Sequence, residues 1–165
     1  MLSTNDAVSS YLQQIQPRGF PDLMAHVHLD LLALLDTYTS TFGLFETNIK
    51  TIQLPDDIAT QYQSGIRNGI DKSHLVLNEL MRELQSIDAG LTQIWMGAFL
   101  HDVRAPLGIL KGWTTLLQDE FATMPTSPML NRVKQLNQEM QSTVDRMYTI
   151  VDACAEYART LRDEK

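Results

Sequence analysis

The spacing of core-type side chains between residues 96 and 121 constrains the fold of this chain more than any other feature. These side chains, apolar except for one threonine, recur at alternating steps of four and three residues, as in a coiled-coil seam: Met96, Leu100, Val103, Leu107, Leu110, Thr114, Leu117 and Phe121. A helix with such a stripe is stable only when other helices cover it. The pattern therefore predicts an all-α protein in which this helix packs against partner helices.

A second helix with the same repeat follows. Its two rows of core positions, each with a seven-residue spacing, are Val133, Met140, Met147, Cys154 and Leu161, and Leu136, Thr143, Ile150 and Tyr157. The segment 124–128 contains two prolines and a capping residue, which predicts the turn between the two helices. We therefore expect residues 91–165 to form a helical hairpin.

This hairpin needs further helices, because two amphipathic helices alone cannot enclose a core. Either the hairpin of a second subunit or the N-terminal helices of the same chain must complete it. We favour a homodimer in which two hairpins form a four-helix bundle. Residues 1–90 would then be a preceding N-terminal helical region that serves as an input or linker.

The N-terminal region is expected to be helical along most of its length. Ser3 or Thr4 caps a short helix, and the segment 16–21, which contains prolines and a glycine, ends it. A second helix starts near Asp22. From residue 37 to residue 52 a continued helix and a short β excursion both fit the sequence, and we favour the helix.

Another start signal stands at residues 54–57, LPDD, where a proline and two carboxylates suit the first turn of a helix. A helical apolar period then runs from Ile58 to Leu91 and leads directly into the helix of residues 96–121. Gly90 marks a possible joint between them. The sequence leaves open whether this part of the chain is one continuous rod or two helices that meet at a kink.

Composition indicates a folded protein rather than a disordered one, because 44% of the residues are hydrophobic and 20% are charged. The net charge of −7 argues against binding to nucleic acid or to an anionic membrane. The most apolar stretch, residues 23–35, contains two histidines and an aspartate and is too short to span a bilayer. No secretory signal is visible at the N-terminus, and we expect a cytoplasmic protein.

Metal and redox chemistry are not indicated by the sequence. His26 and His28 are two residues apart and would point to different sides of a helix, which makes a poor metal pair. The single cysteine, Cys154, rules out an intrachain disulfide and falls on a core position. We therefore predict neither a metal nor a cofactor in this chain.

The residues that could take part in a reaction lie together in the segment Phe99–Leu110, FLHDVRAPLGIL. His101 follows a core leucine, so it should lie on the flank of the seam, with one face of its ring against the bundle and the other open to a reagent. A neutral imidazole is a nucleophile. Pro106 has no N–H for the carbonyl of Asp102, so it should loosen or bend the helix just after the histidine.

The run HDVRAPL, which starts at His101, resembles the H-box of sensor histidine kinases, whose pattern is His, an acidic residue, an aliphatic one, Arg or Lys, a small or polar residue, then Pro-Leu. The resemblance covers about the second half of the chain, the dimerisation and histidine phosphoacceptor hairpin of that family. It implies that His101 is the phosphoacceptor and that Asp102 orients the ring or takes its proton. Arg104 would contact phosphate or a partner carboxylate, and Pro106 would supply the bend.

Two positions depart from the commonest form of the motif. Leu100 stands where a serine is usual. Ala105 stands where many members have a threonine or asparagine that positions water to dephosphorylate the partner. The resemblance therefore leaves open whether this chain has a phosphatase activity.

The resemblance implies a role in two-component signalling, in which His101 receives a phosphoryl group and passes it to an aspartate of a response-regulator receiver domain. The family's ATP-binding domain is missing, since the sequence ends eight residues after Tyr157 and contains neither a P-loop nor a G-x-G-x-x-G motif. We expect ATP and magnesium only on a separate catalytic domain, in cis or in trans, or on the receiver.

We favour the phosphoacceptor portion of a sensor histidine kinase. One alternative is a complete, stand-alone histidine phosphotransfer protein that takes phosphate from one receiver and gives it to another. The other alternative is a non-catalytic helical dimerisation scaffold in which the H-box has no chemical role.

Overall fold

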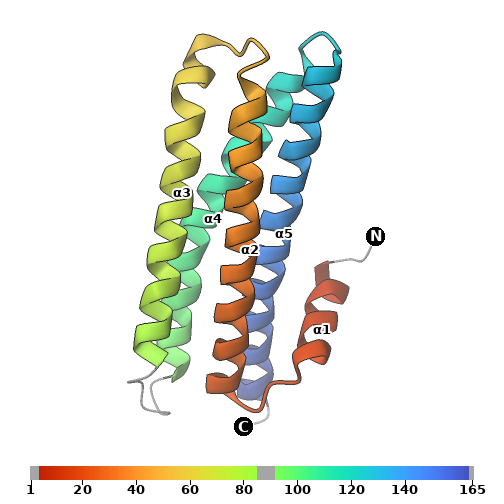
Figure 1. Cartoon of the computed structure of the whole chain (residues 1–165). Coiled ribbons are helices and arrows are strands. Elements are labelled where there is room, and N and C mark those ends of the chain that lie inside the picture. The colour runs from red at the N-terminus through yellow and green to blue at the C-terminus, as the bar shows by residue number, and fades with distance from the viewer. Residues whose placement is uncertain (1–3, 85–91, 164–165) are drawn as a thin grey trace.

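The computed structural model describes residues 4–84 and 92–163, which form α-helices joined by short turns and contain no strand. The all-α prediction is confirmed, and the doubtful segment from residue 37 is helical as far as Ile49. The helices, shown in Figure 1, are α1 (Thr4–Ile15), α2 (Phe20–Ile49), α3 (Asp56–Leu84), α4 (Thr92–Ala122) and α5 (Pro128–Asp163).

The four long helices, α2 to α5, form a bundle in which successive helices run in opposite directions (Figure 1). Helix α2 packs against α3, α3 against α4 and α4 against α5, and α5 closes the bundle against α2. The short helix α1 lies outside this bundle and packs along α5. None of the helices in the described part of the chain is long and apolar enough to cross a membrane.

Helices α3 and α4 lie side by side in antiparallel register. Gly65 of α3 faces the ring of Trp113, and Gly69, one turn later, faces Leu110, one turn earlier on α4. The chain therefore reverses its direction between the two helices, and both a continuous rod and a kinked pair are wrong. The suggested joint at Gly90 lies outside the described residues.

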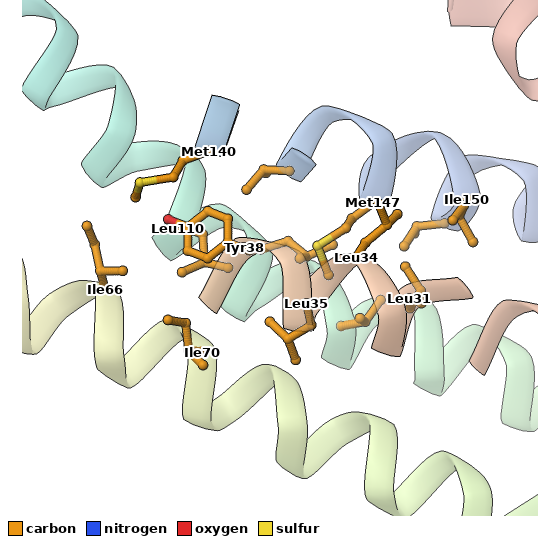
Figure 2. Packing of buried hydrophobic residues seen from close by; sticks show 14 of the residues in the cluster. Leu31, Leu34, Leu35, Tyr38, Ile66, Ile70, Leu110, Met140, Met147 and Ile150 are labelled. Atoms are coloured by element: carbon orange, nitrogen blue, oxygen red, sulfur yellow. The ribbon is translucent and has the colours of Figure 1, made fainter. Parts of the chain in front are cut away.

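One hydrophobic cluster joins all four long helices. Every one of the eight seam positions predicted on α4 is buried, and the predicted core positions of α5 are buried or, for Tyr157 and Leu161, partly buried. Figure 2 shows how the middle of this core brings together side chains from four helices: Leu31, Leu35 and Tyr38 of α2, Ile66 and Ile70 of α3, Leu110 of α4, and Met140 and Met147 of α5.

The seams of α4 and α5 are thus covered by α2 and α3 of the same chain. The N-terminal helices of the same chain, and not the hairpin of a second subunit, therefore complete the core. Association of two chains stays a prediction, and such a dimer would have to use an outer surface of the bundle, because the seams are already buried. The division of the chain into residues 1–90 and 91–165 also stays a prediction, although both segments contribute to one core.

Local signals fix the ends of the helices. Ser127 caps α5, since the backbone N–H of Leu130 donates to its Oγ at 3.1 Å, as the predicted turn requires. Gly19 takes a φ of 109°, which lets the chain turn into α2. The N–H of Gly19 donates to the hydroxyl of Tyr157 at 3.1 Å, and the ring of Tyr157 packs edge-on against Phe20. The start of α2 is therefore anchored on the end of α5.

We expect Gly65→Ala to destabilise the protein, because its Cβ would stand 2.1 Å from Nε1 of Trp113. The displaced ring should lower the free energy of unfolding by about 1–3 kcal/mol, which outweighs the better helix propensity of alanine. The matched control is Gly43→Ala, where the new Cβ meets nothing within 4 Å and should add about 0.5–1 kcal/mol. Urea denaturation measures both values, and equal effects of the two substitutions would contradict the packing of α3 on α4.

Candidate functional site

His101 lies on the outer surface of α4, where its side chain is 89% exposed. The seam explains this position. Leu100 and Val103 point into the core, and His101, which lies between them in the sequence, is on the outer side of the helix. The expectation that one face of the ring rests against the bundle is therefore wrong. Nearly the whole imidazole is open to solvent and to a reagent.

The ring of His101 has one polar neighbour on its own helix. Its Nδ1 stands 3.2 Å from Oδ1 of Asp102, whose side chain is also exposed. An ionised carboxylate only accepts hydrogen bonds, so this contact is a hydrogen bond when the ring carries its hydrogen on Nδ1. The lone pair of the neutral ring is then on Nε2, the nitrogen that is free to attack an electrophile.

The surface of α4 around His101 is made of small side chains. Gly97 and Ala105 lie one turn away on either side, Ala98 and Gly108 flank the same face, and all four are exposed. A Cβ added at Gly97 would meet nothing within 4 Å. Among the described neighbours of His101 along α4, the long side chain is that of Arg104, which reaches toward Asp152 on α5.

Arg104 lies one turn beyond the histidine and reaches across to α5. Its Nη2 is 3.6 Å from Oδ1 of Asp152, and both side chains are about half exposed. Such a surface ion pair contributes little to stability, so the guanidinium can exchange this carboxylate for another anion. Its expected role in holding phosphate or a partner carboxylate stays a prediction.

A second ion pair repeats the first along the same two helices. Lys111 Nζ lies 3.8 Å from Oδ1 of Asp145 and 5.2 Å from the centre of the Tyr148 ring. Both cations on α4 and both acids on α5 are seven residues apart, which is the spacing of flanking charges in a coiled coil. Sequence reasoning missed Asp145, Tyr148 and Asp152, and this shared spacing is the signal that could have found them.

Pro106 is buried inside α4, and the helix continues through it from Thr92 to Ala122. The proline leaves the carbonyl of Asp102 without its usual N–H donor, one residue from the reactive ring. Despite this missing hydrogen bond, α4 is continuous through Pro106. A bend that starts here stays a prediction.

Two buried side chains, His28 and Cys154, are unsuited to act as nucleophiles. His28 is buried in α2, where burial lowers the pKa of its ring below the usual range, although a hydrogen bond to the backbone of Leu77 opposes this shift. Cys154 is fully buried, and burial raises the pKa of its thiol to about 12. Within the described ranges, His, Cys, Asp and Glu side chains do not gather in any group of three that could hold a metal ion.

Comparisons with family models, curated proteins and solved structures find no match for this chain. A function must therefore be argued from the site itself: an exposed imidazole, a carboxylate on its Nδ1 side, and a charged band between α4 and α5.

Diethyl pyrocarbonate, which acylates accessible neutral imidazoles, should modify His101 rapidly and His28 very slowly in the folded protein. The reason is that the side chain of His101 is 89% exposed, whereas His28 is buried. Peptide mass spectrometry after a short exposure measures both rates, with the urea-unfolded chain as the control in which the two rates converge. Equal rates in the folded protein would contradict the described position of His101.

Proposed function

We propose that His101 is the phosphoacceptor of a cytoplasmic two-component signalling protein, and that it passes its phosphoryl group to an aspartate of a response-regulator receiver domain. The observation that carries this proposal is the exposed ring of His101 with the Asp102 carboxylate 3.2 Å from its Nδ1. The H-box resemblance supports it independently. Together they favour a nucleophile at Nε2 on a surface that a partner can reach.

In the proposed first step, Nε2 of His101 attacks the phosphorus of a donor in line with the leaving group. A P–N bond forms while the bond to the leaving group breaks, and the ring gains positive charge. The Asp102 carboxylate stabilises that charge through the hydrogen on Nδ1. In the second step a receiver carboxylate attacks the same phosphorus, the P–N bond breaks, and the neutral imidazole returns.

Little more than presentation of the ring is needed from this chain. Phosphoryl transfer depends mainly on positioning and on charge stabilisation, and the remaining groups are proposed to come from the partner. The donor would be an ATP-binding catalytic domain, in cis or in trans, or a phosphorylated receiver. ATP and magnesium would bind there and not to this chain.

We place the phosphoacceptor portion of a sensor histidine kinase first, with residues 1–90 as its input region and homodimerisation through an outer surface. One structural observation favours the second candidate, a stand-alone phosphotransfer protein. The seams of α4 and α5 are buried within a single chain, so one chain is sufficient to hold His101 on a complete four-helix bundle. Both candidates use the same chemistry at the same ring.

Incubation with phosphoramidate, a donor that transfers its phosphoryl group to imidazole nitrogen and releases ammonia, should phosphorylate His101. The product should be labile in acid and stable in base, as a phosphohistidine is. His101→Gln should abolish it, and His74→Gln should leave it unchanged. Asp102→Asn should slow the reaction by about 10- to 100-fold, which is the kinetic equivalent of one charge-assisted hydrogen bond.

Protein mass and acid lability, followed over time, measure these effects. Equal phosphorylation of the His101→Gln protein would show that the acceptor is another residue. A folded wild-type protein that gains no phosphate would favour the third candidate, a helical scaffold in which the H-box has no chemical role.

A further inference from the structure

A groove lies between α1 and the bundle, far along the chain from the histidine. It is bounded by α1 on one wall, by α2 on the other and by α5 at its floor, and it has a volume of about 770 Å³. Figure 1 shows α1 standing beside α2 and α5 at this place. The volume is in the range of pockets that bind small organic molecules.

Helix α1 is tied to the bundle beside this groove. The hydroxyl of Tyr11 donates to Oδ2 of Asp30 on α2 at 2.7 Å. Burial and the neighbouring Asp30 carboxylate raise the pKa of Tyr11, so the hydroxyl keeps its hydrogen and remains a donor. Only one carboxylate oxygen of Asp30 is used by this bond, and the other can accept from a ligand.

The groove contains an acidic and a basic side chain that form no ion pair with each other. Asp30 stands on the α2 wall and Arg146 on α5, and both line the groove. Within the described residues, Arg146 has no acidic partner and forms no ion pair with Asp30. The other ionisable side chain of the lining besides Tyr11 is His26, which lies 3.7 Å from Asp22.

The rest of the lining combines apolar side chains with the polar side chains of Ser10, Gln14, Thr37 and Thr149. Its apolar side chains are Leu34 on α2 and Ile150 on α5, both largely buried in the bundle, and Ile15 on α1. Two small side chains, Ala7 and Ala33, leave the space open on the opposite walls. A ligand with charged groups therefore also finds apolar side chains, Ile15, Leu34 and Ile150, to contact.

We propose that this groove binds a small zwitterion with an apolar body, of the class of α-amino acids with aromatic or aliphatic side chains. The ammonium group would bind Asp30, the carboxylate would bind Arg146, and the side chain would cover Leu34 and Ile150. A molecule with only one of the two charges leaves either the carboxylate or the guanidinium unpaired and binds more weakly. This inference is independent of the phosphoacceptor role of His101.

Isothermal titration calorimetry of the full chain with L-phenylalanine and L-leucine tests the proposal. At least one of them should bind at concentrations up to about 10 mM. For L-phenylalanine, two analogues separate the charges: 3-phenylpropionate lacks the ammonium group and 2-phenylethylamine lacks the carboxylate. Removal of either charge should weaken binding by about tenfold or more.

Three variants locate the site. Arg146→Gln and Asp30→Asn should each weaken binding of the amino acid by about tenfold, whereas the matched exposed controls, Arg132→Gln and Asp119→Asn, should not. Ala33→Trp should block the groove. Arg146 is exposed, so its variant should fold normally, and circular dichroism verifies this for each protein. Absence of binding by both amino acids, equal binding of the singly charged analogues, or full binding by the folded Arg146→Gln protein would each overturn the proposal.

Discussion

The burial of one apolar stripe on each of four helices is the constraint on which the rest of this structure depends. A single apolar stripe would be exposed to water. The core forms because α2 and α3 cover the seams of α4 and α5. Once Leu100 and Val103 point inward, the position of His101 is fixed on the outer face of the same helix. The packing of the core therefore determines the exposure of the candidate nucleophile.

The outer surface has a different character from the core. Its ion pairs, Arg104 with Asp152 and Lys111 with Asp145, are well exposed to solvent, and pairs of this kind contribute at most about 1 kcal/mol each. They can be exchanged for a phosphoryl group or for the side chains of a partner at little cost in stability. A packed core and exchangeable surface pairs are compatible with the proposed phosphotransfer at His101.

The sequence predicts each helix better than it predicts their arrangement. The eight seam positions of α4, the core rows of α5 and the turn before Pro128 follow from apolar spacing and capping, which are local properties. The apolar spacing of α3 continues without a break toward α4, so the sequence does not show that the chain reverses its direction between them. Amphipathic spacing defines the buried face of a helix but not the helix that covers it. The same limit explains why the closure of the bundle by α2 and α3, the nearly complete exposure of His101 and the pairing of Arg104 with Asp152 appear only in the structure.

The central claim is that Asp102 holds the ring hydrogen on Nδ1 of His101 and leaves Nε2 as the phosphoacceptor. Long-range ¹H–¹⁵N NMR of protein labelled with ¹⁵N-histidine, recorded before and after phosphorylation, tests it most directly. The account predicts that the resting ring of His101 carries its hydrogen on Nδ1 and that the phosphoryl group appears on Nε2. A resting hydrogen on Nε2, or phosphorylation at Nδ1, would contradict it.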